Sequence, residues 1–260
     1  MDLGIQNKSC LVTGGCNGIG AELSLALLKE GCHVTATSRS DATKFFQTIP
    51  GELRTHLKII TAELSNPEGI HELCRKTDFQ YDILINNAGH TLSVKDPSCS
   101  LDDWNKVLYL NFLSCVELVN KAAPHMKTKG WGRIINITSC AGLENSGPVT
   151  FTSAKAALTA YTRSMGRIFA IESPGIVMSA LYPGVIVTPG GHWEKILRDD
   201  PSHAERYIKE RCPLGRFGSI EEFVPAVLFF CSTHASFAHG SIIGIDGGQS
   251  KHFSQYNYEP

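Results

Sequence analysis

Between residues 13 and 20 the chain reads Thr13-Gly14-Gly15-Cys16-Asn17-Gly18-Ile19-Gly20. An apolar segment that we predict as a strand, Ser9–Thr13, leads into this turn, and a predicted helix over Gly18–Glu30 follows it. Gly31 then stands where a helix C-cap belongs. Glycines let a backbone turn tightly and approach a pyrophosphate, and a helix N-terminus offers it free N–H groups. The order strand, glycine turn, helix therefore predicts a dinucleotide site.

The same alternation of short apolar segments and helical segments continues to the end of the chain. Five further strands and one long helix are predicted from it: strands at His33–Thr37, Ile83–Asn86, Arg133–Thr138, Val177–Leu181 and Ile242–Ile245, and a helix at Ser153–Ala170. Apolar strands separated by amphipathic helices are typical of a parallel sheet covered on both faces. Since no linker or repeat divides the sequence, we predict one doubly wound, Rossmann-type α/β domain over residues 1–260.

Composition narrows the possible partners. The 24 basic and 25 acidic side chains leave a net charge of −1, which gives no electrostatic footprint for nucleic acid. We see neither a signal peptide nor an apolar run of the roughly 20 residues that a membrane span needs. The nine cysteines are scattered and the histidines lack metal-ligand spacing. We expect a cytoplasmic protein with reduced thiols that binds no metal, nucleic acid or membrane.

The residues after the second predicted strand bear on the choice of dinucleotide. An acidic side chain there would accept hydrogen bonds from the ribose 2′-OH of NAD. This chain has Ser38 and Arg39 instead, and an arginine can pair bidentately with the 2′-phosphate of NADP. We therefore predict NADP(H) in preference to NAD(H). Asp41 is close enough to keep NAD(H) open, and Arg39 can also be read as a solvated loop residue.

Several motifs in order along the chain carry a family resemblance. The spacing T-G-x-x-x-G-x-G at Thr13–Gly20 is followed by Asn86-Asn87-Ala88-Gly89, by Lys155, by Pro183-Gly184, and by Asp246-Gly247-Gly248. In these motifs the chain resembles the short-chain dehydrogenases/reductases over nearly its whole length. The resemblance implies an oxidoreductase that transfers a hydride between a nicotinamide cofactor and a carbonyl or hydroxyl group of a small molecule.

The resemblance also implies roles for individual residues. Asn111 matches the asparagine of a proton relay, Ser139 the catalytic serine, and Lys155 the lysine that binds ribose and acts electrostatically. The cofactor-binding set that it implies is Gly14, Cys16, Asn17, Gly18, Ile19, Gly20, Ser38, Arg39, Glu63, Leu64, Asn87, Ala88, Gly89, Lys155, Pro183, Gly184 and Thr188. It further implies a homotetramer or dimer in which the helices that contain Asn111 and Lys155 form the subunit interface.

One position departs from the family pattern. The motif Y-x-x-x-K reads Phe151-Thr152-Ser153-Ala154-Lys155, so the residue expected to be the acid has no proton to give. Loss of a positioned general acid typically costs about 10²–10⁴ in rate. Either a native tyrosine has been replaced, or divergence has left another acid or a binding protein with a regulatory or scaffold role. Tyr182 is a further phenol near the motifs, although we interpret it as a packing residue.

The family's variable substrate lid corresponds to residues 188–213. Here Gly190-Gly191 would serve as a hinge, and the segment after it is polar rather than broadly apolar. This composition favours a polar substrate such as a sugar or sugar acid, contacted by Ser139, His192 and Trp193 and by His90 after the Asn-Asn-Ala-Gly motif. Trp193 would either stack on a sugar ring or anchor the lid. An aromatic C-terminal tail such as residues 251–260 is usually frayed, whereas the family resemblance implies that it packs on a neighbouring subunit.

Overall fold

A computed structural model describes residues 1–144 and 146–251, and the predicted packing of the tail falls almost wholly outside this range. Its centre is a seven-stranded parallel sheet in the order β3-β2-β1-β4-β5-β6-β7. The strands are β1 Ser9–Val12, β2 His33–Ser38, β3 Leu57–Thr61, β4 Ile83–Asn86, β5 Gly132–Ile137, β6 Ile176–Pro183 and β7 Ile242–Ile245. The strand order reverses between β1 and β4, which is where doubly wound sheets bind their ligands.

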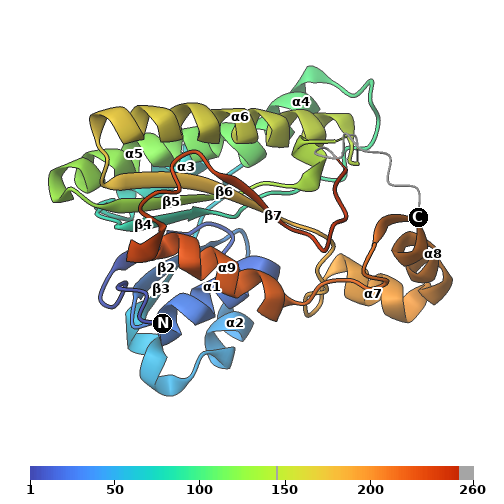
Figure 1. Cartoon of the computed structure of the whole chain (residues 1–260), viewed down its shortest axis with the longest axis horizontal. Helices are drawn as coiled ribbons and strands as arrows, with labels where there is room; N and C mark the ends of the chain where they lie inside the picture. The colour runs from blue at the N-terminus through green and yellow to red at the C-terminus, as the bar shows by residue number, and fades with distance from the viewer. Residues whose placement is uncertain (145, 252–260) are drawn as a thin grey trace.

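Helices cover both faces of the sheet (Figure 1). One layer contains α1 Gly18–Lys29, α2 Thr43–Thr48 and α9 Ile220–Cys231, and the other contains α3 Pro67–Arg75, α4 Leu101–Leu108, α5 Ser114–Lys129 and α6 Val149–Glu172. Side chains of one strand alternate between two cores: Leu11 packs toward α3 and α5, whereas Val12 packs toward α1 and α9. The strands are therefore apolar on both faces, which confirms the doubly wound α/β prediction.

The predicted elements are found, with two differences near functional positions. Helix α6 begins at Val149 instead of Ser153, because Pro148 has the extended conformation of an N-cap and the helix follows directly. Position 151 therefore lies inside the helix. The helix predicted to contain Asn111 is found, but it includes a π-helical turn over Tyr109–Leu113 between α4 and α5. Such turns often occur at functional sites.

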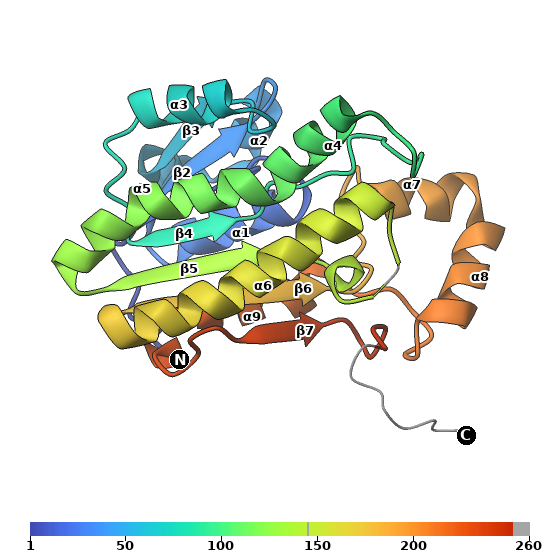
Figure 2. The ribbon, with the colours of Figure 1, turned by 90° about the horizontal axis from the view of Figure 1, so that it is seen from above.

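The predicted lid is helical and lies outside the two layers. Helices α7 His192–Asp199 and α8 Pro201–Arg211 lie beyond the carboxyl ends of the strands, on the side to which the strand arrows point (Figure 2). Gly190, just before α7, has φ +69° and open space around its α-carbon. No helix in the described part of the chain is long and apolar enough to span a membrane.

Candidate active site

The glycine turn after β1 is shaped for close approach of a ligand to the backbone. Gly14 and Gly18 have φ of +61° and +51°, a conformation that side chains disfavour. A Cβ on Gly20 would lie 2.2 Å from the carbonyl oxygen of Gly14, so only glycine fits there. The N-terminal turn of α1 has no acidic residue, and Asn17 makes no side-chain cap. Its N–H groups and partial positive charge are therefore available to an anion.

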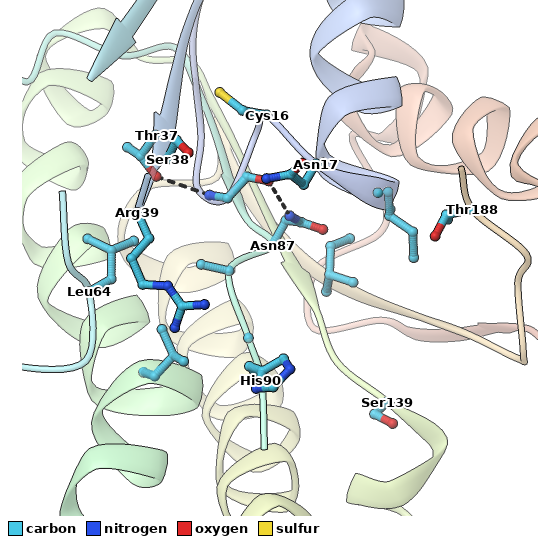
Figure 3. Close-up of a pocket in the computed structure, with 18 of the residues that line it drawn as sticks. Cys16, Asn17, Thr37, Ser38, Arg39, Leu64, Asn87, His90, Ser139 and Thr188 are labelled. Atoms are coloured by element: carbon cyan, nitrogen blue, oxygen red, sulfur yellow. Dashed lines mark hydrogen bonds between the residues drawn. The ribbon is translucent and has the colours of Figure 1, made fainter. Parts of the chain in front are cut away.

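Hydrogen bonds from neighbouring strands hold this turn in place. The Oγ1 atom of Thr13 accepts from the backbone N–H groups of Asn87 and Ala88, both at 2.9 Å. The side-chain amide of Asn87 donates back to the carbonyl oxygens of Thr13 and Gly14, at 2.9 and 3.3 Å. The N–H of Gly14 donates to Oγ1 of Thr37 at 3.0 Å (Figure 3). The ends of β1, β2 and β4 are thus tied into one rigid cradle.

A cavity of about 600 Å³ runs along the carboxyl ends of the strands. It is lined by 21 of the residues predicted for the site: Gly14, Cys16, Asn17, Gly18, Ile19, Gly20, Ser38, Arg39, Glu63, Leu64, Asn87, Ala88, Gly89, His90, Ser139, Phe151, Lys155, Pro183, Thr188, His192 and Trp193. Asn111 and Gly184 do not line it. Six lining residues were not predicted: Thr37, Ala62, Leu110, Ile137, Thr138 and Ile186. Three of these six, Thr37, Ala62 and Thr138, directly precede predicted positions at strand ends, so strand-end position was the signal that could have found them.

Arg39 and Leu64 lie on one side of this cavity, and Ser139 and Thr188 lie on the other (Figure 3). Arg39 is exposed and forms no ion pair with any residue that the structure describes. Nearby, Oε1 of Glu63 accepts from the N–H of Ser65 at 3.0 Å and so caps its own loop. The guanidinium of Arg39 is therefore available to pair with an anionic group of a ligand at this end of the cavity.

Lys155 lines the cavity, and its amine is buried. Its Nζ donates to the carbonyl oxygen of Ile137 at 2.9 Å, and the residue is 3% exposed. Because burial disfavours the charged form, it lowers the pKa of the Lys155 ammonium to about 8. A Cβ on Gly89 would lie 2.9 Å from this Nζ and 2.8 Å from Oδ1 of Asn111. The glycine of the Asn-Asn-Ala-Gly motif therefore allows the lysine and the asparagine to approach the same loop.

Phe151 stands one helical turn before Lys155 on α6, with its ring centroid 5.7 Å from the lysine Nζ. Both residues line the cavity, as does Ser139, whose Oγ accepts from the N–H of Ala141 at 3.2 Å. The serine, the lysine and the aromatic ring thus line the same cavity. The ring itself carries no ionisable group there.

Asn111 is fully buried in the π-helical turn and supports the loop that carries His90. Its Nδ2 donates to the carbonyl oxygens of Val107 at 2.8 Å and His90 at 2.9 Å, and its Oδ1 accepts from the N–H of His90 at 3.1 Å. Both amide hydrogens are therefore used by the backbone. The observed contacts make Asn111 a support of this loop, and its part in a proton relay stays a prediction.

Trp193 packs on two aromatic side chains, which is consistent with the interpretation that it anchors the predicted lid. Its ring centroid lies 4.4 Å from that of Tyr207 on α8 and 4.7 Å from that of Phe217. It also lines the cavity, so stacking on a substrate stays a prediction.

Tyr182 does not line the cavity, and its hydroxyl lies 3.3 Å from Oγ of Ser250. Among the described residues, no group of three or more His, Cys, Asp or Glu could hold a metal ion.

Comparison with known proteins agrees with this geometry. A family model described as short chain dehydrogenase matches residues 8–195. The chain belongs to the short-chain dehydrogenase family. It is 33% identical over 255 residues to a 3-oxoacyl-(acyl-carrier-protein) reductase of Aquifex aeolicus, a match that covers 95% of this chain and 99% of that protein.

Two further relatives carry names from sugar chemistry. The 2-dehydro-3-deoxy-D-gluconate 5-dehydrogenase of Bacillus subtilis is 31% identical over 247 residues, which cover 94% of this chain and 95% of that protein. An L-sorbose reductase of Gluconobacter frateurii, solved with NADPH and L-sorbose, superposes with a TM-score of 0.86 at 26% identity and covers 96% of this chain and 99% of its own. The chain is therefore a short-chain dehydrogenase/reductase enzyme that uses a nicotinamide cofactor.

Proposed function

We propose that the protein is an NADP(H)-dependent oxidoreductase for a polar carbonyl or hydroxyl compound, with turnover limited by Phe151. The observation that carries this proposal is the continuity of one cavity from the glycine turn and Arg39 to Ser139, Phe151 and Lys155. A dinucleotide is long, and this cavity offers an anion-binding helix end at its middle and polar side chains at both ends. The cofactor supplies the hydride when it is bound.

The residues of the cavity suit the parts of such a cofactor. The N-terminal turn of α1 receives the pyrophosphate, and Arg39 with Ser38 receives the 2′-phosphate. Lys155 binds ribose hydroxyls, and the Oγ of Ser139 orients the oxygen of the substrate. By holding the cofactor and the substrate in a fixed relative orientation, these residues would lower the entropic part of the barrier to hydride transfer.

We propose a sugar or sugar acid as the substrate class. The lid helix α7 presents His192 and Trp193 to the cavity, and His90 adds a second imidazole to its lining. Imidazoles and an indole suit hydroxyl groups and the apolar face of a sugar ring. The likeness to the gluconate and L-sorbose enzymes supports this class, whereas the likeness to the 3-oxoacyl reductase supports an acyl thioester.

The substrate class can be tested by a panel of purified compounds. Ketoses and keto-sugar acids would be compared with acetoacetyl thioesters as substrates for NADPH oxidation, in the parent protein and in Phe151→Tyr. Activity on the sugar compounds supports the proposal. Activity confined to the thioesters would contradict it. The absence of any turnover in both proteins, despite tight NADPH binding, would favour the alternative of a regulatory or scaffold protein.

Arg39→Ala tests the cofactor assignment. We expect the parent to bind NADPH at least about tenfold more tightly than NADH, a difference of about 1.4 kcal/mol. Arg39→Ala should remove most of this preference and leave NADH affinity nearly unchanged, because the guanidinium contacts only the extra phosphate. Titration of cofactor fluorescence measures all four affinities. Lys44→Ala removes the same charge from exposed α2, outside the cavity lining, and should keep the preference. Equal affinities of the parent for both cofactors would refute the assignment.

A further inference from the structure

The segment after β7 folds back against the site in a compact turn. One carboxylate oxygen of Asp246 accepts from the N–H of Gly248 at 2.9 Å, and the other accepts from the N–H of Ser250 at 3.0 Å. Gly247 and Gly248 have φ of +61° and +79°, which this turn requires. The turn places the side chain of Gln249 inside the protein, where the residue is only 7% exposed.

Both ends of the Gln249 amide are used. Its Oε1 accepts from the backbone N–H of Val185 at 2.9 Å, and its Nε2 donates to the hydroxyl of Tyr207 at 3.1 Å. A Cβ on Gly184 would lie 3.0 Å from this Oε1 and 2.8 Å from the α-carbon of Asp246. Glycine at position 184 therefore lets the amide come close to the chain after β6.

One partner of Gln249 lies in the turn after β6, and the other lies on helix α8. Val185 follows Pro183, which lines the cavity at the end of β6. Tyr207 lies on α8 of the lid, and its ring packs on Trp193, which lines the cavity from the lid side. One buried amide thus joins the turn after β6 to the lid through two directional hydrogen bonds.

We propose that Gln249 is a positioning residue that couples occupancy of the cofactor cavity to the order of lid helix α8. A cofactor that orders the turn at Pro183–Val185 also orders the Oε1 acceptor, and the same rigid amide then orients the Tyr207 hydroxyl. Such coupling is reciprocal, so a well-ordered lid also favours cofactor binding. The proposal rests on the proposed function, because it requires the cofactor to lie against this turn.

Hydrogen exchange of the full-length protein, with and without saturating NADPH, tests the coupling. We expect NADPH to slow exchange in α8 by roughly fivefold or more in the parent, the lower end of usual coupling strengths. Gln249→Met keeps the length of the side chain but removes both hydrogen bonds, and Tyr207→Phe removes only the bond to the lid. In both variants the effect of NADPH on α8 should disappear. Tyr182→Phe removes a hydroxyl near Ser250 and keeps the Gln249 bonds, so it should behave like the parent.

The response to NADPH separates coupling from a merely structural role. A structural role of Gln249 would speed exchange in α8 equally with and without NADPH, and that result would overturn the proposal. Persistence of the NADPH effect in both variants would also overturn it, since packing of Phe217 on Trp193 would then carry the coupling. Fluorescence titration first establishes binding in each protein. A parent that binds neither NADPH nor NADH refutes the proposed function itself, whereas binding without any change in α8 refutes only the coupling.

Discussion

Phe151→Tyr is expected to raise kcat by about 10²–10⁴ while changing cofactor affinity little, because a phenol at this position adds a general acid and acts on the proton-transfer step. The geometry for this gain is already present. Position 151 is one turn before Lys155 on α6, both side chains line the cavity, and the ring centroid is 5.7 Å from the lysine Nζ. Hydride transfer to a carbonyl leaves an alkoxide, and the new hydroxyl would supply its proton.

Steady-state kinetics on the best compound from the substrate panel measures this gain. Phe151→Leu adds no hydroxyl and serves as the control that should show no increase. The pH–rate profile of Phe151→Tyr should show a group that titrates below the ordinary tyrosine value of about 10, since a nearby ammonium favours the phenolate. An ordinary rate in the parent, with no gain from the tyrosine, would mean that another residue is the acid. Lys155 and His192 would be the first to test, because the hydroxyl of Tyr182 is held near Ser250 outside the cavity lining.

Lys155→Met is expected to stabilise the cofactor-free protein at pH 7 by about 2 kcal/mol. Burial lowers the pKa of Lys155 to about 8, against roughly 10.4 in the unfolded chain, so the folded state holds the proton less tightly. Below pH 8 the folded state carries the full cost of burying the charge, about 3 kcal/mol. Loss of the hydrogen bond to Ile137 offsets about 1 kcal/mol of the gain.

The stability difference between Lys155→Met and the parent should decrease as the pH rises. Between pH 8 and about 10.4 the unfolded chain binds more protons at this lysine, so the parent gains stability relative to Lys155→Met as the pH rises. Urea unfolding of both proteins at pH 7 and above pH 10 measures the two differences. Lys44→Met, at an exposed position of α2, is the matched control for the replacement of a lysine by methionine. A Lys155→Met protein that is less stable than the parent at pH 7 would show that the folded site stabilises the ammonium.

Local patterns in the sequence were enough for the architecture and for much of the cavity. The glycine turn at residues 13–20 was recognisable because the conformation of a tight turn and the start of a helix depend on neighbours within a few residues. The apolar strands were recognisable because burial on both faces leaves a continuous apolar run. Parallel strands bring their carboxyl ends to one edge of the sheet. Residues predicted separately, such as Arg39 and Ser139, therefore line one cavity.

Other features depend on contacts between segments far apart in the chain. The Asn111 side chain supports the His90 loop, which the π-helical turn brings beside it from 21 residues away. The packing of Tyr207 and Phe217 on Trp193 likewise depends on positions 14 and 24 residues further along the chain. Gln249 carried no sequence signal at all, since its two partners lie 64 and 42 residues away.

The chain's own residues thus specified the succession of strands and helices, the glycine cradle and the unusual Phe151, because each depends on residue types and on neighbours within a turn or a strand. The burial that depresses the pKa of Lys155 and the bridge from Gln249 to the lid exist only once the chain is folded. Desolvation and directional hydrogen bonds depend on which distant groups surround an atom. Those surroundings are set by the packing of helices on the sheet, and no local pattern encodes them.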